Sequence, residues 1–325
     1  MVGPSITYEL SSKADDAELV ELFREFYPHL GWSDAYLAWQ YHENPAGPAQ
    51  VWVARDGKKI VASYSAIPHK MHIMGRTAIG WRIQDVLTRP EYRGMGIYHA
   101  LSEVASESIF KPEFPLNFSF PNERSHQGFM RTGWTASFRI PLRILSGVQS
   151  GHYENIPATV SPISHFDHHT DRIWSSYVSR FDFTLHRSSD YLNWRYLSNP
   201  RARYFPFRVT LDEDEIVLVL KNYEREDNSK WVHICDLFYS AGNLELLDCA
   251  MKHSINFAVE LGAGSISCWC PSGSVLESAL NRHQFMPEDS LNRWLVINGN
   301  VPDMDINQLC DETRWHLAMG DSDVF

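Results

Sequence analysis

A ten-residue pattern occurs twice in this chain and limits the architectures that the sequence can adopt. Tyr36–Pro45 and Tyr191–Pro200 share the template Y-L-x-W-x-Y-x-x-N-P, which contains one tryptophan and two tyrosines. The offset of 155 residues (191 − 36) is the size of a domain rather than of a solenoid repeat. In each copy, aromatic residues at helical spacing stop at Asn-Pro, and two short strands follow. The sequence therefore predicts two related halves.

The strands that follow the two copies are flanked by turn residues. Gln50–Ala54 and Ile60–Ala66 are predicted for the first half, and Phe205–Leu211 and Ile216–Leu220 for the second. Between the halves, the sequence is rich in Gly, Ser and Pro and lacks periodicity. The expected division is a first domain at 1–145, a linker at 146–165 and a second domain at 166–325. A polar, acidic tail begins at residue 301, with one helix expected at Asp305–Leu317.

The composition excludes several classes of protein. Apolar residues make up 44% and charged residues 21%, which is typical of a globular chain and not of a fibrous or disordered one. With 29 Lys and Arg against 40 Asp and Glu, the net charge is -11. Such a balance disfavours general binding to nucleic acid or to anionic membranes. We therefore expect no nucleic-acid partner and no membrane partner.

Targeting and metal-binding patterns are missing from the sequence. The first residues lack a basic region followed by a long apolar run, and no stretch approaches the ~18–20 apolar residues of a membrane span. The five cysteines all lie in the last third, in a spacing that fits neither a redox pair nor a zinc site. We expect reduced thiols, a cytoplasmic location and no metal.

The segment from Ile79 to Ile109 has the order strand, glycine-containing turn and helix. Ile79–Thr88 is predicted as a strand, and the apolar spacing over Ile97–Ile109 is helical. Between them, Gly94 and Gly96 allow a ligand to approach the backbone, and the first N–H groups of the helix favour an anion. Arg93 adds a positive charge. This is the chemistry of a phosphate or diphosphate site, although neither G-x-G-x-x-G nor a Walker A motif is present.

A second strand and a second motif follow. Leu116–Phe120 is predicted as a strand, and Asn122 comes directly after it, where a side-chain amide can hold polar ligand atoms. Ser125, Phe129, Gly133 and Trp134 then follow at positions +3, +7, +11 and +12 from Asn122.

Together the two segments resemble the acyl-CoA-binding core of the GNAT superfamily of N-acyltransferases, over roughly residues 20–145. Arg93–Ile97 matches the motif Q/R-x-x-G-x-G/A up to its last position, and Asn122–Trp134 matches N-x-x-[AS]-x-x-x-[YF]-x-x-x-G-[FW] throughout. The resemblance implies that the coenzyme A diphosphate lies on the turn, and that pantetheine pairs with the preceding strand. It also implies that an N–H near Val86 polarises the thioester carbonyl. The implied coenzyme A site comprises Leu87, Thr88, Arg93, Gly94, Met95, Gly96, Ile97, Tyr98, Asn122, Ser125 and Phe129.

This chain departs from the family at two positions of its motifs. Tyr98 replaces the last glycine of the turn, so a bulky ring is expected beside the diphosphate site. Phe129 stands where many members have the tyrosine that protonates the leaving thiolate, and a phenyl ring cannot donate a proton. The remaining candidates for this acid are Tyr98, Ser125, His126 and water.

The identity of a catalytic base is open. Arg82, Gln84, Val86 and Thr88 share one face of the predicted strand, where many relatives carry a catalytic Glu. Neither Arg82 nor Gln84 is a base at pH 7, and Asp85 points the other way unless a bulge turns it. We therefore expect direct attack by a neutral amine, without a dedicated carboxylate base. The candidate catalytic residues are Gln84, Asp85, Val86 and His126.

The second half repeats the order of elements but not the glycine turn. Lys230–Tyr239 and Ser265–Cys270 are predicted strands on either side of the helix Leu244–Leu261. Its turn, Ser240–Asn243, lacks the second glycine and the cation. The expected fold is thus α/β (α+β), with two tandem GNAT-like mixed-sheet domains, of which the second is degenerate and forms one side of the acceptor site.

Length and tandem architecture resemble a group of sugar N-acyltransferases that act on nucleotide-linked amino sugars, such as dTDP-3-amino-3,6-dideoxyhexoses. The resemblance implies acyl-CoA as co-substrate and a small amine as acceptor, and the candidate acceptor-binding residues are Arg82, Arg187 and Arg195. Acylation of a peptide, an aminoacyl group or an antibiotic is the alternative within the same class. A coenzyme A sensor without catalytic activity is the alternative outside it.

Overall fold

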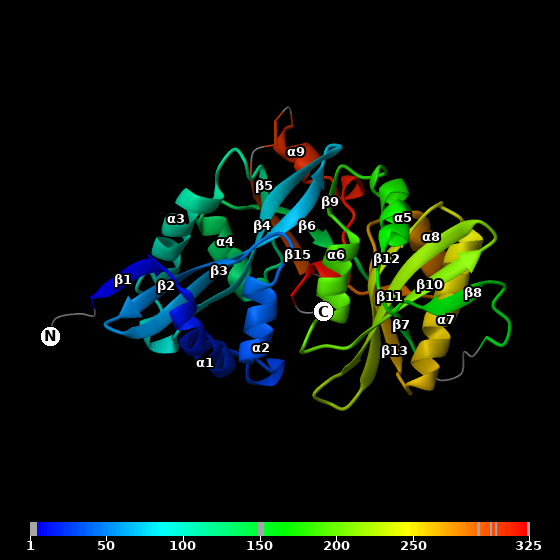
Figure 1. The fold of residues 1–325 in the computed structure, drawn as a ribbon, viewed down its shortest axis with the longest axis horizontal. Helices are drawn as coiled ribbons and strands as arrows, with labels where there is room; N and C mark the ends of the chain where they lie inside the picture. The colour runs from blue at the N-terminus through cyan, green and yellow to red at the C-terminus, as the bar shows by residue number, and fades with distance from the viewer. Residues whose placement is uncertain (1–4, 149–152, 291–292, 300, 303, 324–325) are drawn as a thin grey trace.

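The computed structural model describes residues 5–148, 153–290, 293–299, 301–302 and 304–323. In this part of the chain, the strands form two mixed sheets that lie side by side, with helices packed on each (Figure 1). The predicted mixed α/β fold class is confirmed.

The first sheet has the strand order β1-β2-β3-β4-β5-β15-β6, and β9 pairs with the outer end of β3. Neighbouring strands are antiparallel except β4 and β5, which are parallel and connected through α3. The strands are β1 (Ile6–Leu10), β2 (Gln50–Asp56), β3 (Lys59–Ile73), β4 (Arg76–Thr88), β5 (Leu116–Ser119), β6 (Thr135–Ile140), β9 (Phe183–Leu185) and β15 (Arg293–Gly299). The helices of this half are α1 (Asp16–Phe26), α2 (Asp34–Leu37), α3 (Ile97–Ile109) and α4 (Glu123–Arg131).

The second sheet has the order β14-β7-β13-β12-β11-β10-β8, and its parallel pair is β12 with β13, connected through α7. The strands are β7 (Leu142–Ser146), β8 (Thr159–Pro162), β10 (Tyr204–Leu211), β11 (Asp214–Glu224), β12 (Lys230–Tyr239), β13 (Ser265–Trp269) and β14 (Met286–Pro287). The helices are α5 (His168–Val178), α6 (Ser189–Leu192), α7 (Leu244–Glu260), α8 (Val275–Arg282) and α9 (Ile306–Leu309). The order of strand, helix and parallel strand is thus the same in both halves.

The two sheets exchange strands near the predicted boundary. β7 begins at Leu142 and pairs with β13 of the second sheet, whereas β15 returns from the second half and lies between β5 and β6. Division at residue 145 therefore does not coincide with the division between the sheets. Within the expected linker, residues 149–152 lie outside the described residues, and β8 is a strand that pairs with β10.

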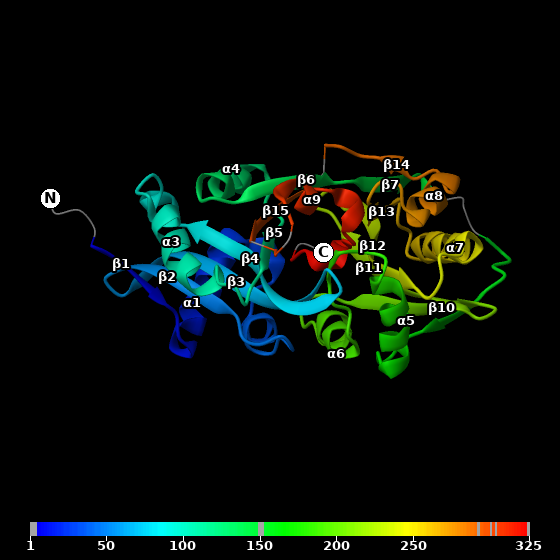
Figure 2. The ribbon, with the colours of Figure 1, turned by 90° about the horizontal axis from the view of Figure 1, so that it is seen from above.

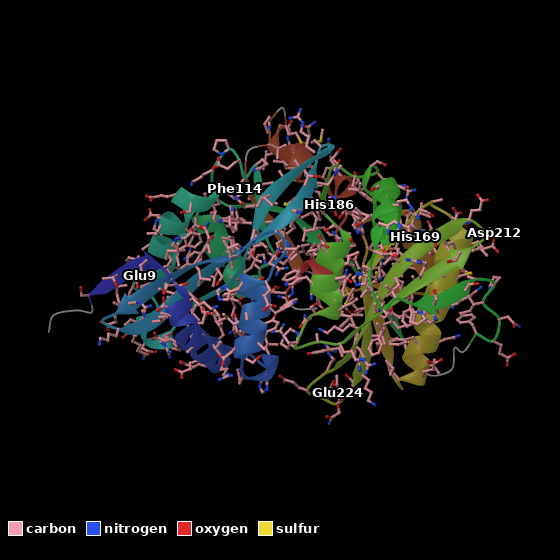
Figure 3. All side chains as sticks on the ribbon, viewed as in Figure 1. Glu9, Phe114, His169, His186, Asp212 and Glu224 are labelled. Atoms are coloured by element: carbon pink, nitrogen blue, oxygen red, sulfur yellow. The ribbon has the colours of Figure 1, made fainter. Side chains whose placement is uncertain are left out.

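Both copies of the repeated pattern form a helical turn followed by a short π-helix. The π-helical parts are Ala38–His42 and Asn193–Leu197, and each follows a helix with a serine N-cap. Trp39 and Trp194 are buried and stack on each other where the halves meet. Side chains fill the junction between the halves, as Figure 3 shows.

The C-terminal segment differs from the expected polar tail. The helix expected at Asp305–Leu317 is wrong: α9 ends at Leu309, and short 3-10 turns follow at Glu312–Arg314 and Met319–Asp321. Trp315, Leu317 and Met319 are buried in a hydrophobic cluster, because the segment runs between the two halves (Figures 1 and 2). Its polar residues are spaced between buried apolar ones, and composition alone does not reveal this.

Candidate active site

The end of β4 separates from β5 and opens a cavity in the first half. In the described residues, these strands pair only at Arg82 and Phe118, although β4 continues to Thr88. Among the strands that the structure describes, only β3 pairs with β4 from Ile83 onward, so the other edge of β4 has no strand partner among them. The cavity has a volume of about 260 Å³ and is lined by Tyr27, Leu30, Arg82, Ile83, Gln84, Asp85, Val86, Ser119, Phe120, Pro121, Asn122, Ser125, Phe129, Arg293 and Asp323.

A β-bulge in β4 turns Asp85 into this cavity. The register between β3 and β4 shifts between Ser63 and Ser65, so that Asp85 and Val86 together face one residue of β3. Asp85 adopts a left-handed φ of 48°, a conformation that aspartate tolerates better than most residues. Strict alternation would place Asp85 on the face opposite Gln84, yet both line the cavity. The exception named for Asp85, a bulge that turns it, therefore applies.

Hydrogen bonds fix the Asp85 carboxylate from one side. Its Oδ2 accepts a bond of 2.9 Å from the Tyr41 hydroxyl and one of 2.8 Å from the Gln84 amide. Gln84 is held in turn by Arg82, whose Nε donates to its Oε1 at 2.8 Å. Among the described residues, no hydrogen bond uses Oδ1 of Asp85. One oxygen of an oriented carboxylate is thus left for a ligand.

The surroundings of Asp85 increase its affinity for a proton. Burial, together with the negative charge of Asp323, raises the pKa of Asp85 to about 6, although the bonds from Tyr41 and Gln84 favour the charged form. At pH 7 the carboxylate is therefore mostly ionised, and it accepts a proton more readily than an ordinary aspartate. This is the property of a general base.

The predicted glycine turn leads from β4 into α3. Gly94 and Gly96 have φ values of 78° and 76°, and a Cβ added at either would meet no atom within 4 Å. Glycine is therefore required for the backbone conformation, and the space above the turn is open. The Nε of Arg93 donates to the carbonyl of Thr88 at 3.1 Å, which holds the cation beside the turn. The open backbone, the helix N-terminus and this cation fit a diphosphate.

The other residues of the predicted turn contribute mainly through their backbone. Ile97 and Leu87 are buried, at 2% and 7% exposure, and Met95 is exposed. The ring of Tyr98 does not lie over the turn as expected: it packs against Gly128 of α4, and its hydroxyl hydrogen-bonds Thr132 at 3.2 Å. Burial raises the pKa of Tyr98, which weakens the case for it as the acid.

Three residues of the second motif line the cavity at the start of α4. Asn122 is the N-cap of this helix, and its Oδ1 accepts from the Ser125 amide at 3.0 Å and from the Ser125 hydroxyl at 3.1 Å. Phe129 is 3% exposed and forms the apolar floor, in edge contact with Trp134 at 5.0 Å. The Ser125 hydroxyl is therefore the proton-donating side chain among these three.

His126 lies apart from the other candidates. Its ring stacks on Trp294 of β15 with a centroid distance of 4.8 Å, and it does not line the cavity. Within the described residues, its buried Nε2 has no hydrogen-bond partner. The structure gives no support to a catalytic role for His126.

The three arginines predicted for the acceptor have internal partners. Arg187 is fully buried and binds Asp236 and Asp321, the latter at 2.7 Å. Arg195 is 4% exposed and donates to the backbone of the C-terminal segment and to Tyr204. These two residues fix the C-terminal segment, so their assignment to the acceptor is corrected. Arg82 lines the cavity but also donates to the carbonyl of Asp321 at 2.7 Å.

Several lining residues were not foreseen from the sequence. Tyr27 and Leu30 follow α1, Arg293 begins β15, and Asp323 belongs to the C-terminal segment. No motif marks them, because they reach the cavity only through the strand exchange and the return of the chain end. The acidic composition of the tail was the one signal for Asp323.

The described residues contain neither a metal site nor a membrane-spanning helix. No group of three or more His, Cys, Asp or Glu side chains is arranged there to hold a metal ion. No helix in the described parts of the chain is long and apolar enough to cross a membrane.

Comparison with known proteins identifies the first half. Residues 12–136 match the sequence model of a family described as "Acetyltransferase (GNAT) domain". These residues are thus similar to a GNAT acetyltransferase domain. The matched segment contains the bulge at Asp85, the glycine turn and the Asn122 motif. No curated protein sequence matches the chain.

Solved structures share the fold over nearly the whole length. A GCN5-related N-acetyltransferase from Anabaena variabilis matches with a TM-score of 0.64 and 13% identity, over 91% of this chain and 73% of that one. A probable N-acyltransferase from Enterococcus faecalis gives 0.63 and 13%, over 90% and 72%. The N-myristoyltransferase of Saccharomyces cerevisiae with bound myristoyl-CoA gives 0.62 and 11%, over 92% and 80%. The solved structures show the fold, and the family match over residues 12–136 supports an acyl-CoA-dependent N-acyltransferase.

Proposed function

We propose that this protein transfers an acyl group from coenzyme A to the amino group of a small molecule. The observation that carries the proposal is the position of the Asp85 carboxylate. It faces the cavity at the open end of β4, within the GNAT domain, and one of its oxygens has no hydrogen bond among the described residues. A base with a pKa of about 6 therefore lies beside the strand edge on which the thioester is proposed to bind.

The co-substrate is proposed to bind to the turn and to the free edge of β4. The amides of Gly94 to Tyr98 and the Arg93 guanidinium would hold the diphosphate, and the backbone of Leu87 and Thr88 would pair with the pantetheine arm. Support comes from the open space above both glycines and from the missing strand partner of β4 beyond Arg82.

The chemistry needs one proton acceptor and one proton donor. As the amine nitrogen forms its bond to the thioester carbon, Asp85 takes the proton that the nitrogen loses. The Val86 N–H stabilises the negative charge on the carbonyl oxygen. The C–S bond then breaks, and the thiolate receives a proton from water or from the Ser125 hydroxyl, which regains a proton from water. Asp85 releases to solvent the proton that it took from the amine, so no net proton is gained or lost by the protein. This route replaces the direct attack expected from the sequence, because the bulge places a carboxylate in the cavity.

For the acceptor, we propose an amino sugar carried on a nucleotide, of the dTDP-3-amino-3,6-dideoxyhexose type. The second half is proposed to be a repeat that binds no coenzyme A and forms one side of the acceptor site. Support comes from a second cavity that adjoins the first, shares Leu30 and Arg293 with it and is lined mainly by the second sheet. A peptide, aminoacyl or antibiotic amine is the alternative acceptor, and a sensor would need no base.

The test is release of free thiol from acetyl-CoA and longer acyl-CoAs, measured with a panel of dTDP- and UDP-linked amino sugars and with peptide amines. We expect thiol release with at least one nucleotide-linked amine, and loss of turnover in Asp85→Asn with unchanged coenzyme A affinity. Tight coenzyme A binding without thiol release on any amine would favour the sensor. Turnover with peptide amines only would contradict the nucleotide-linked sugar as the acceptor.

A further inference from the structure

A second cavity of about 260 Å³ adjoins the Asp85 cavity on the side of the second sheet. The two cavities share Leu30 and Arg293 as lining residues, so they are neighbours, and the two together are called the groove here. The second cavity is lined by Leu30, Leu142, Ile144, Tyr223, Arg225, Trp231, His233, Ser267, Trp269, Arg293 and Met319.

The strand register explains why these residues share one face. Trp231 pairs with Tyr223 across β11 and β12, and His233 pairs with Ser267 across β12 and β13. Ser267 in turn pairs with Ile144 of β7. Because residues that face each other across strands point to the same side of a sheet, they form a row across the second sheet. The hairpin between β11 and β12 lies at one end of this row. Glu224, the last residue of β11, is labelled in Figure 3.

Aromatic rings dominate the hairpin end of the row. Tyr223 and His233 have a centroid distance of 5.4 Å and an interplanar angle of 33°. Burial and the charges of Lys221 and Arg225 lower the pKa of His233 to about 3, so its ring is neutral at pH 7. Tyr223 is 45% exposed, and an exposed ring of this kind offers a flat surface on which a planar ligand can stack.

Two cations of the groove are available to an anion. Arg225 lies with its Cζ 4.7 Å from the Trp231 ring centroid, and Arg293 lines both cavities. Among the described residues, neither guanidinium forms a hydrogen bond or an ion pair of 4 Å or less. By contrast, Arg187 is neutralised by Asp236 and Asp321. Two arginines without an internal anion, in a chain of net charge -11, indicate that the groove is complementary to an anionic ligand.

We infer that this groove binds the nucleoside diphosphate part of the acceptor. The base stacks between Tyr223 and the Arg225–Trp231 pair, and the guanidinium groups of Arg225 and Arg293 hold the diphosphate. The sugar amine then extends past Arg293 towards Asp85. A diphosphate offers several oxygens to two guanidinium groups at once, which a single carboxylate does not. This assignment rests on the proposed acyl transfer, but it concerns a different part of the groove.

The test is binding of dTDP and UDP, without sugar and without coenzyme A, measured by titration calorimetry on the full chain. We expect binding that weakens about tenfold or more in Arg225→Gln and in Arg293→Gln, and also with added salt. Arg139→Gln is the matched control, because Arg139 stacks on Trp294 at 5.0 Å and lines neither cavity. Coenzyme A affinity should be the same in all three variants.

Any of three results would overturn the assignment while leaving acyl transfer intact. The first is thiol release with an amine while neither nucleotide binds, and the second is nucleotide binding that Arg225→Gln and Arg293→Gln leave unchanged. The third is binding of a carboxylate-bearing peptide through these arginines in place of the nucleotide. Nucleotide binding lost in both arginine variants, together with a chain that releases no thiol, would instead contradict the proposed function alone.

Discussion

Trp39 and Trp194 donate hydrogen bonds to each other's backbone carbonyl. The Trp39 Nε1 lies 2.8 Å from the Trp194 oxygen, the reciprocal distance is 2.9 Å, and the stacked rings have centroids 4.7 Å apart. The two residues hold the same place in the two copies of the repeated pattern. The relationship is therefore mutual, and it joins the two copies of the pattern where the halves meet.

Removal of one indole donor should weaken this junction. Trp39→Phe deletes a buried hydrogen bond and leaves the Trp194 carbonyl without its partner, so we expect the free energy of unfolding to fall by about 1–3 kcal/mol. Urea denaturation measures the change. Trp294→Phe is the control, since the Trp294 indole makes no hydrogen bond within the described residues and should cost less. Equal midpoints for wild type and Trp39→Phe would contradict the structural role.

In both copies of the repeated pattern, a tyrosine hydroxyl donates a hydrogen bond to an aspartate carboxylate. Tyr41 donates to Asp85 at 2.9 Å, and Tyr196 donates to Asp236 at 2.9 Å. The two carboxylates differ in their other neighbours, because Asp236 is 1% exposed and is neutralised by Arg187. The same local geometry thus forms a structural ion pair in the second half and an accessible carboxylate in the first.

The pH dependence of turnover should follow Asp85. The base acts only when ionised, so kcat/KM is expected to rise with pH up to about 6, the pKa of Asp85, and to level off above it. Asp85→Asn should lower kcat by about 10²–10⁴-fold and remove this inflection. Asp212→Asn, in an exposed turn of the second half, is the control. Turnover close to that of the wild type in Asp85→Asn would contradict a general-base role for Asp85 and favour direct attack by a neutral amine.

Tyr41 should tune this inflection without taking part in the reaction. Its hydrogen bond stabilises the charged form of Asp85, so Tyr41→Phe is expected to raise the pKa of Asp85 and to move the inflection to higher pH by roughly half a unit to one unit. The pH profile of kcat/KM measures the shift. Tyr177→Phe removes a comparable bond, to His316 at 3.1 Å, and should leave the profile in place. A decrease in turnover at all pH values without a shift would assign Tyr41 a purely structural role.

Local patterns predicted the parts of the site that are continuous in sequence. The helix expected over Ile97–Ile109 matches α3, and the space above Gly94 and Gly96 is open, as their expected contact with a ligand requires. The orientation of Asp85 could not be predicted, because a bulge depends on the register with β3. Alternation of side chains left two orientations open, one with a bulge and one without, and local sequence does not decide between them.

Long-range contacts account for the rest of what sequence reasoning missed. Arg187 and Arg195 were candidates for the acceptor, but the C-terminal segment folds over them and supplies hydrogen-bond partners to both. Arg293 reaches the cavity because β15 crosses into the first sheet. Each of these contacts joins residues about a hundred or more positions apart, and no local period records such a pairing.

Gly96 should matter for coenzyme A more than for folding. Gly96→Ala forces an alanine into φ 76°, which costs about 1–2 kcal/mol of stability, and its methyl group enters the space proposed for the diphosphate. We expect coenzyme A affinity to fall about tenfold or more, as measured by calorimetry. Gly262→Ala imposes a similar strain at φ 66° in the loop after α7 and should leave that affinity unchanged. Similar losses of affinity in both variants would mean that strain, not the site, is responsible.

The burial that raises the pKa of Asp85 should also lower the free energy of unfolding at neutral pH. The pKa of Asp85 rises from 3.8 to about 6 on folding, so the folded state binds the proton more tightly than the unfolded state. By linkage, stability then falls as pH rises between about 4 and 6, and stays reduced above. The Asp85→Asn variant has a neutral side chain at this position, so folding does not bury a charge there. At pH 8 it should be more stable than wild type by about 1–3 kcal/mol, with the difference vanishing near pH 4. Urea denaturation at both pH values measures this, and a variant less stable than wild type at pH 8 would show that the carboxylate is not strained by burial.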